Sequence, residues 1–141
     1  MNEYIYCNKK DQRKAVEVCR KAIEVQRLWK PKVGDWFVTP AGKVELFDKS
    51  FYIKENFISD YDIIENELWE RKKIYWLPRQ DQLQDMVKSE YECDYDMNLD
   101  FTEFTTNLYT HEQIGASMEQ LWLAFVMHEL HSKQWDGKQW K

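Results

Sequence analysis

The sequence predicts an α+β fold in which a small antiparallel sheet of three to four strands is covered by an N-terminal and a C-terminal helix. Apolar residues follow helical spacing near both ends of the chain, and short strand-like runs lie between prolines and turns in the first half. The 141 residues match the length of one domain, so we expect a single domain over residues 1–141. Aromatic residues make up 16% of the chain, far more than a flexible tail carries.

The first predicted element is a helix over residues 9–29. Its apolar face is formed by residues three or four positions apart, namely Val16, Cys19, Ala22 and Ile23. Pro31 ends the helix because the residue before a proline disfavours the helical conformation. Further apolar residues widen this stripe, so we expect the helix to pack on two sides.

Three strands are predicted next, over residues 33–39, 43–47 and 51–54. Each is rich in strand-forming residues and is separated from the next by turn residues, which is typical of an antiparallel meander. A fourth strand is predicted over residues 74–77, where Pro78 interrupts an apolar run. Residues 55–72 suit either a helical turn or loops.

A second helix is predicted over residues 79–87. Asp81 and Gln84 have the spacing of a capping pair, and Leu83 starts the buried stripe of this helix. The following acidic and aromatic stretch has poor periodicity, so we expect a loop over residues 93–110 with one strand around 101–108.

The C-terminal helix begins at Ser117, where Gln120 completes a capping box, and it closes near Lys133. Residues 121–127 are all apolar, so this helix must be buried on every side. Either it is the central helix of the domain or its outer face meets a second copy, most simply in a homodimer. The Asp136–Gly137 dipeptide then predicts a type I′ hairpin turn.

The formal net charge of −5 argues against general affinity for duplex DNA. Positive charge is nevertheless concentrated near the N-terminus, at Lys9, Lys10, Arg13, Lys14, Arg20, Lys21, Arg27, Lys30 and Lys32. A solvated helix face explains this stretch, and a nucleic-acid-binding patch is the alternative. Acidic residues concentrate between Asp81 and Glu103, so we expect an electrically lopsided molecule.

Two sets of residues resemble metal sites. His128 and His131 lie at i and i+3 on the last helix, where Glu129 or a carboxylate from elsewhere could complete a metal site, but the spacing is not that of zinc peptidases. A site of three histidines would need the fold to bring His111 close. Residues 92–103 place acids at positions of a calcium-binding EF-hand loop, yet position 6 is Met rather than Gly. We expect no metal at either place: the histidines suit an ordinary helix end, and the acids an exposed loop.

Motifs of nucleotide-binding proteins and of serine or cysteine hydrolases are missing from the sequence, so we assign no catalytic residue and no cofactor. The longest apolar run has seven residues, whereas a membrane span needs about 20. Cys7, Cys19 and Cys93 are too few and too scattered for a disulfide framework. They suit reduced thiols, and since the first residues do not resemble a signal peptide we expect a cytoplasmic protein.

The tryptophans suit either a core or a binding surface, because large aromatic side chains dominate both. We expect Trp36, Trp76 and Trp122 in the core. Trp135 and Trp140 lie near the end of the sequence, and we expect them to dock onto the rest of the domain.

Three segments carry a resemblance to known proteins. They are WKPKVGDWF from Trp29, IYWLPRQDQLQDMV from Ile74 and SMEQLWLAFVMHE from Ser117, the last completed by WDGKQW from Trp135. Together they resemble an uncharacterised family of small proteins encoded in phages and prophages of Gram-positive bacteria. The resemblance implies a bacterial cytoplasm and an accessory role, and it implies no activity, cofactor or catalytic residue.

We therefore expect a non-enzymatic protein-interaction module of the phage or prophage accessory type, acting on a host or phage protein. The alternative is a nucleic-acid-associated protein that uses the basic N-terminal helix.

Overall fold

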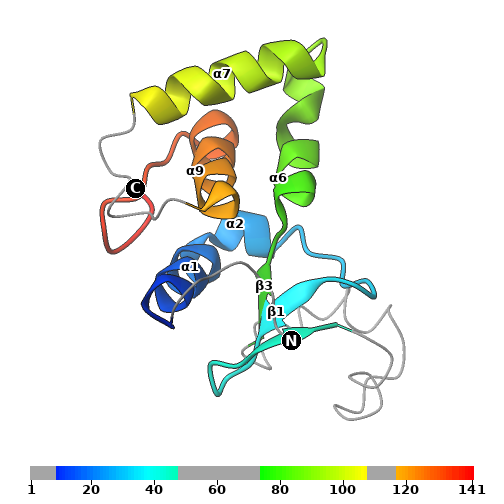
Figure 1. The fold of residues 1–141 in the computed structure, drawn as a ribbon, viewed down its shortest axis with the longest axis vertical. Helices are drawn as coiled ribbons and strands as arrows, with labels where there is room; N and C mark the ends of the chain where they lie inside the picture. Colours follow the sequence, from blue (N-terminus) through cyan, green and yellow to red (C-terminus); the bar gives the residue numbers. More distant parts are fainter. Residues whose placement is uncertain (1–8, 48–73, 108–116) are drawn as a thin grey trace.

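A computed structural model describes residues 9–47, 74–107 and 117–141, and it confirms the predicted α+β fold (Figure 1). The helices are α1 (Lys9–Lys21), α2 (Ile23–Gln26), α6 (Gln80–Val87), α7 (Asp94–Thr106) and α9 (Met118–His131), with a 3₁₀ turn η1 (Lys88–Glu90). The strands are β1 (Trp36–Val38), β2 (Val44–Leu46) and β3 (Tyr75–Leu77). No helix in these described ranges is long and apolar enough to cross a membrane.

The sheet is antiparallel and has the order β2-β1-β3. Phe37 in the central strand lies opposite Glu45 on one side and Trp76 on the other. The strands predicted within 33–39, 43–47 and 74–77 are thus confirmed, whereas the strand expected over 51–54 lies outside the described residues. In the described sheet β1 is central, because β2 pairs with one of its edges and β3 with the other.

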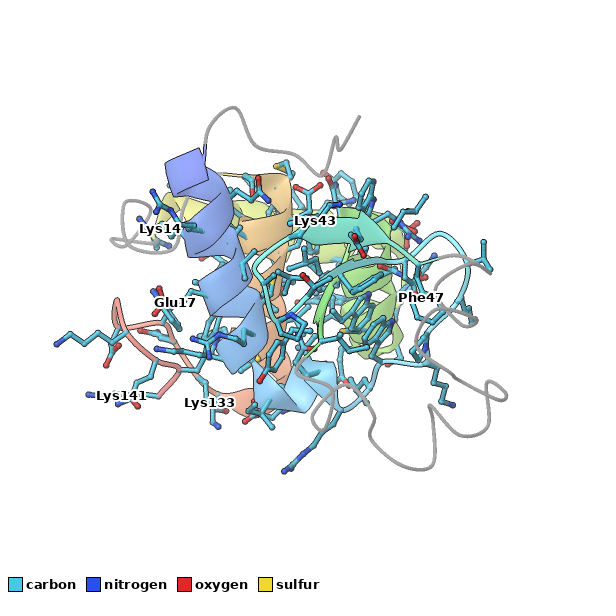
Figure 2. The ribbon with its side chains drawn as sticks, turned by 90° about the horizontal axis from the view of Figure 1, so that it is seen from below. Lys14, Glu17, Lys43, Phe47, Lys133 and Lys141 are labelled. Atoms are coloured by element: carbon cyan, nitrogen blue, oxygen red, sulfur yellow. The ribbon has the colours of Figure 1, made fainter. Side chains whose placement is uncertain are left out.

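The N-terminal helix packs on two sides, as its wide apolar stripe predicts. α1 contacts β3 on one side and α9 on the other. The C-terminal segment that carries Lys133 and Lys141 also lies next to α1, away from the sheet (Figure 2). α1 is therefore the layer that joins the sheet to the helices.

The single helix predicted over residues 9–29 is wrong, because the helix breaks at Ala22. This residue has φ −81° and ψ 71°, which lies outside the helical region, and the short helix α2 follows. Neither proline nor glycine occurs between residues 9 and 29, so the sequence has no marker for this break. The break turns α2 so that Gln26 faces the sheet.

Gln26 is fully buried and its side-chain amide behaves like an additional peptide group at the edge of β3. Its Nε2 donates to the carbonyl oxygens of Cys19 at 2.9 Å and Trp76 at 2.8 Å. Its Oε1 accepts the backbone N–H of Trp76 at 2.8 Å. The outward-facing backbone groups of Trp76 are thereby paired, which closes this edge of the sheet to another strand.

The helix predicted over residues 79–87 is confirmed as α6, but the expected capping pair of Asp81 and Gln84 is wrong. Gln82 caps the helix instead, since its Oε1 accepts the backbone N–H of Arg79 at 2.9 Å. Asp81 cannot serve as the cap because α6 has already begun at Gln80 and its carboxylate faces the Arg79 guanidinium.

The loop expected over residues 93–110 and the strand around 101–108 are also wrong, because residues 94–106 form the helix α7. Met97 and Phe101 are buried one helical turn apart, and Phe104 continues this face. The exposed Tyr95 and Leu99 occupy the opposite face and hide the helical period in the sequence. Only the tertiary contacts identify which apolar residues form the inner face.

α9 confirms the predicted C-terminal helix and its cap. The Ser117 hydroxyl accepts the backbone N–H of Gln120 at 3.1 Å, and the helix ends where Ser132 adopts a left-handed conformation with φ 54°. Residues 122–127 are all buried, and α1, α6 and α7 pack around the helix. One chain therefore covers α9, which is the first of the two predicted alternatives, and the homodimer stays an untested prediction.

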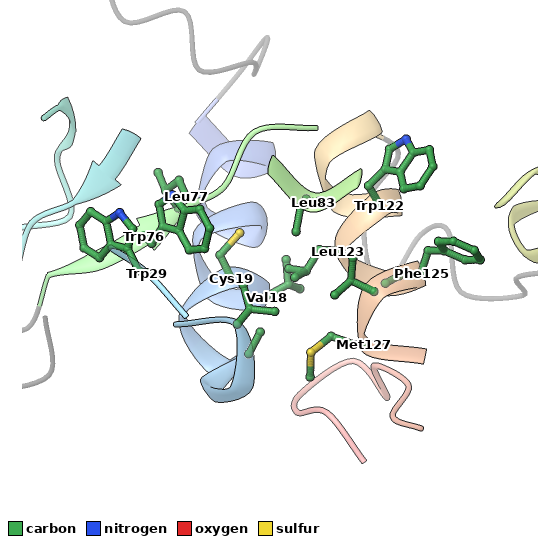
Figure 3. Close-up of a cluster of buried hydrophobic side chains, with 14 of the residues drawn as sticks. Val18, Cys19, Trp29, Trp76, Leu77, Leu83, Trp122, Leu123, Phe125 and Met127 are labelled. Atoms are coloured by element: carbon green, nitrogen blue, oxygen red, sulfur yellow. The ribbon is translucent and has the colours of Figure 1, made fainter. Parts of the chain in front are cut away.

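The aromatic residues build one continuous core on both sides of α1 (Figure 3). Trp29 stacks on Trp76 next to the sheet, with ring centroids 6.2 Å apart and an interplanar angle of 3°. Phe101 of α7 stacks on Trp122 of α9 at 3.9 Å. The core positions predicted for Trp76 and Trp122 are confirmed, and Trp36 packs half-buried against the same core.

Residues 134–141 form a short hairpin, which we call the C-terminal hairpin. Trp135 and Trp140 pair across it and both are buried, so the predicted docking of these two side chains is confirmed. The turn is a four-residue loop rather than the predicted two-residue type I′ turn. Asp136 opens the loop and Gly137 follows it with φ 100°. The Asp136 carboxylate accepts the backbone N–H groups of Lys138 and Gln139.

Replacing Gln26 by Leu is expected to lower the free energy of unfolding by about 3 kcal/mol, because it leaves the buried N–H and carbonyl of Trp76 without partners. Urea denaturation followed by tryptophan fluorescence measures the change. The control is Gln134→Leu, at an exposed position whose side chain makes no such bonds. Equal stability of the two variants would contradict the role assigned to the Gln26 amide.

Candidate functional site

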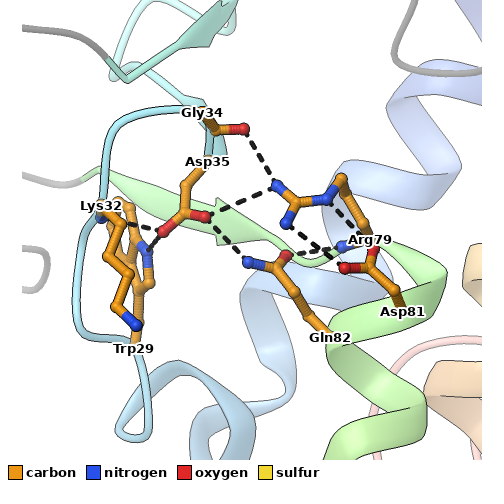
Figure 4. Close-up of polar contacts among 7 residues, drawn as sticks. All are labelled: Trp29, Lys32, Gly34, Asp35, Arg79, Asp81 and Gln82. Carbon is orange, nitrogen blue, oxygen red and sulfur yellow. Dashed lines mark hydrogen bonds and ion pairs between the residues drawn. The ribbon is translucent and has the colours of Figure 1, made fainter.

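The most buried carboxylate of the described chain belongs to Asp35, which is only 3% exposed just before β1. It accepts hydrogen bonds from Trp29 Nε1 at 3.0 Å, from the backbone N–H of Lys32 at 3.0 Å and from Gln82 Nε2 at 2.8 Å (Figure 4). The carboxylate thus ties the chain after α2 to the start of α6.

Arg79 completes this cluster from the N-terminus of α6. Its guanidinium donates to the carbonyl oxygen of Gly34 at 2.9 Å and to the Asp81 carboxylate at 3.1 Å, and it lies 3.6 Å from the Asp35 carboxylate (Figure 4). The buried charge is therefore paired and hydrogen-bonded, as stability requires. We call these side chains the Asp35 network.

The Asp35 network joins two of the sequence segments singled out above, WKPKVGDWF from Trp29 and IYWLPRQDQLQDMV from Ile74. Trp29 and Asp35 come from the first segment, and Arg79 and Gln82 from the second. Each of these polar side chains bonds another part of the same chain, so the two segments are matched to each other in the fold. Their role in the structure is to join β1 to α6.

A different site lies at the surface, where α1, β3 and the C-terminal hairpin meet. They enclose an open groove of about 790 Å³, which we call the basic groove. Its charged lining comprises Arg20, Lys21, Lys138, Lys141 and Asp136, and its other lining residues are Ile23, Tyr75, Gln139 and Trp140. Four cationic side chains therefore face one carboxylate.

The C-terminal hairpin is held against α1 by direct bonds, which gives the groove its second wall. Trp140 Nε1 donates to the backbone carbonyl of Val18 at 3.0 Å, and Lys21 Nζ donates to the carbonyl of Lys138 at 2.7 Å. Beside the hairpin, Lys133 forms an ion pair with Glu24 of α2. This pairing lowers the pKa of Glu24, although its partial burial acts in the opposite direction.

The cations of the basic groove differ in whether they already form an ion pair with a carboxylate of the same chain. Lys21 also pairs with Glu17 at 3.1 Å, and Lys141 pairs with Asp136 at 3.1 Å. Among the residues that the structure describes, no carboxylate lies within 4 Å of the charged groups of Arg20 or Lys138. These two side chains are the ones that can pair with an incoming anion.

The position of the Arg20 side chain is fixed by a contact with the sheet as well as by its place on α1. Its guanidinium lies over the ring of Tyr75 in β3, 6.0 Å from the ring centroid. A guanidinium stacked in this way keeps its N–H edge available for hydrogen bonds to an anion. Ile23, 38% exposed, adds an aliphatic surface to the same groove.

The histidines singled out in the sequence do not meet a third ligand in the described chain. His128 packs against Phe104 with ring centroids 5.0 Å apart, and its Nδ1 lies 3.3 Å from the Glu129 carboxylate. His131 is half-buried, and His111 lies outside the described residues. Across residues 9–47, 74–107 and 117–141 no group of three metal-ligating side chains occurs.

The EF-hand register over residues 92–103 does not correspond to a loop. Residues 94–106 are helical, so their carboxylates are spread around α7 and cannot converge as those of a calcium-binding loop do. Cys93 is exposed just before this helix, whereas Cys19 is buried in the core, and burial raises the pKa of the Cys19 thiol to about 12. The buried thiol therefore stays protonated and unreactive at neutral pH.

The predicted electrical asymmetry is reflected in the elements that carry the charges. Arg20 and Lys21 from the N-terminal basic stretch line the basic groove, whereas the acidic stretch lies on α6, η1 and α7. The sequence analysis missed Lys138 and Lys141, because they lie more than 100 residues away and meet α1 only through the hairpin. The signal that points to them is the aromatic pair that docks this hairpin.

Comparisons with protein-family models, with curated proteins and with solved structures found no match to this chain.

Asp136 is expected to titrate well below an ordinary aspartate. Its carboxylate accepts two backbone N–H groups and pairs with Lys141, which together lower its pKa to about 2. Since the folded-state pKa is lowered, the stabilisation of the hairpin turn is complete above the ordinary pKa of about 3.9 and is lost as the pH falls towards 2.

An NMR titration of the side-chain carboxyl carbons between pH 1.5 and 6 measures this value. Exposed acids such as Asp85 supply the internal control in the same spectra. A midpoint for Asp136 that coincides with those of the exposed acids would show that the turn does not hold its carboxylate in solution.

Proposed function

We propose that the protein is a non-enzymatic protein-interaction module of the phage or prophage accessory type, which acts in the cytoplasm and binds its partner at the basic groove. The observation that carries the proposal is the convergence of four cations from two distant segments on one groove of a chain whose net charge is −5. Electrostatic complementarity of this kind gives an interface its specificity and accelerates association.

The arrangement of the groove supports a binding role. Gathering like charges on one surface opposes folding, so they need compensating contacts. The hairpin supplies these through Trp140 and through the bond from Lys21 to the carbonyl of Lys138. Arg20 and Lys138 then remain as cations without a carboxylate partner in the described chain, and a partner protein that brings acidic groups satisfies them.

The buried carboxylate of Asp35 and the buried thiol of Cys19 serve the fold. The Asp35 carboxylate is used by three donors from its own chain, and the Cys19 thiol is buried and protonated. These observations favour a binding module over an enzyme.

A nucleic-acid-associated function is the second candidate, because Arg20 and Lys21 of the basic N-terminal stretch both line the groove. Phosphate contacts by lysine and arginine weaken steeply with salt. This candidate therefore requires that labelled oligonucleotides bind at low salt and dissociate as the salt concentration rises.

The proposal is tested by capturing partners of the tagged protein from bacterial lysate at moderate salt. The groove variant is Arg20→Gln with Lys138→Glu, and the control variant is Lys30→Gln with Lys32→Glu, which changes the net charge equally at exposed positions outside the groove. We expect the wild type and the control to retain the same stoichiometric protein, and the groove variant to retain about tenfold less of it.

Circular dichroism and thermal melting establish that all three proteins are folded to the same extent. Equal retention of that protein by the groove variant would contradict the assignment of the interface to the basic groove. Retention of nucleic acid alone would favour the second candidate.

A further inference from the structure

We infer that the occupant of the basic groove is an acidic segment of a partner protein that carries one apolar side chain among its carboxylates. The inference rests on the proposed function and specifies the chemistry of the partner. It is drawn from the charges of the groove, from its aliphatic surface and from the way its aromatic rings are used.

The cationic side chains of the groove favour a partner segment that carries carboxylates. Arg20 presents a planar guanidinium, which binds a carboxylate through two parallel hydrogen bonds. Lys138 stands across the groove on the C-terminal hairpin and offers a second positive charge. Lys21 pairs with Glu17 and Lys141 pairs with Asp136, so these two lysines contribute positive charge to the groove but no free partner for the ligand. Two carboxylates of one segment are thus matched by two cations on opposite walls.

The aliphatic surface of the groove favours a partner segment with an apolar side chain between its carboxylates. Ile23 begins α2 directly after the break at Ala22, and this position leaves its side chain 38% exposed at the groove. Tyr75 is half-buried beside it, with Arg20 over its ring. A leucine, isoleucine or phenylalanine of the partner would cover this aliphatic surface and gain the free energy of apolar burial.

The aromatic rings disfavour single-stranded nucleic acid as the occupant. Bases bind on exposed aromatic faces, each of which supplies a stacking platform. Trp140 is only 8% exposed and its Nε1 is bonded to Val18, while the guanidinium of Arg20 covers Tyr75. The groove therefore has cations but lacks an open aromatic face on which a base could stack.

A second copy of the chain is the competing occupant, because α7 presents similar chemistry. Its outer face exposes Tyr95 at 70% and Leu99 at 50%, and Asp96 and Asp100 lie next to them in the sequence. Self-association through this face would place α7 of one copy in the groove of another, either reciprocally in a two-fold dimer or head to tail in an open chain. The test below therefore includes the oligomeric state.

The test measures binding of fluorescein-labelled 12-residue peptides by fluorescence anisotropy at low and at physiological salt. The first peptide contains Asp and Glu around a central Leu. The second replaces the Leu by Gly, the third replaces the acids by Asn and Gln, and a 12-residue oligothymidylate tests nucleic acid. Sedimentation velocity of the free protein between about 1 and 100 μM follows self-association.

We expect the acidic peptide with Leu to bind the wild type and the Lys30→Gln, Lys32→Glu control equally. Its affinity falls about tenfold in the Arg20→Gln, Lys138→Glu variant, because the charge pairs are lost. Ile23→Ala weakens binding of this peptide about threefold but leaves that of the Gly-containing peptide unchanged. The neutral peptide and the oligothymidylate bind weakly to all of these proteins.

Failure of the acidic peptide to bind, or equal binding by the groove variant, overturns the inference. If the groove variant nevertheless loses a protein partner in the lysate experiment, the proposed function stands and only the assigned partner chemistry is wrong. Tighter, groove-dependent binding of the oligothymidylate overturns both. Concentration-dependent self-association that the groove substitutions abolish assigns the groove to a second copy and overturns the inference of an external partner.

Discussion

The rest of the structure depends on one constraint, which is that residues 121–127 of α9 are apolar around the whole circumference of the helix and have to be covered on every side. α1, α6 and α7 pack around it, and residues 122–127 are buried as a result. Covering a helix so completely removes a large apolar area from water, which is the main favourable term in folding. The sheet therefore lies beyond α1 rather than directly on α9.

This arrangement creates two junctions at which polar groups have to be buried, and each is closed by specific side chains. At the junction of α2 with β3, the Gln26 amide forms hydrogen bonds with the backbone N–H and carbonyl of Trp76, which point outward from the edge of the sheet. At the junction of β1 with α6, the Asp35 network holds a buried carboxylate with three donors. The side chains at the second junction come from residues 29–35 and 79–82, which are far apart in the sequence and meet only in the folded chain.

Three features of the structure could not be predicted from the sequence, each for a physical reason. α7 was predicted as a loop because Tyr95 and Leu99 add apolar residues to its outer face and hide the spacing of Met97 and Phe101. The break at Ala22 has no proline or glycine to mark it and serves a contact with Trp76 that lies 50 residues away. Half of the basic groove was predicted as a charged stretch, whereas the other half depended on the docking of Trp140 on α1.

The sequence by itself determined the fold class, the described strands, the capped C-terminal helix with its buried apolar segment, and the docking of Trp135 and Trp140. These features follow from hydrophobic periodicity and cap chemistry, which act between near neighbours in the chain, and from the large apolar surface that each tryptophan has to bury. The tertiary structure alone decided which strand pairs beside β1, where the first helix breaks and which cations share a groove. Those outcomes depend on contacts between residues far apart in sequence, whose favourable free energy exists only once the core has brought them together.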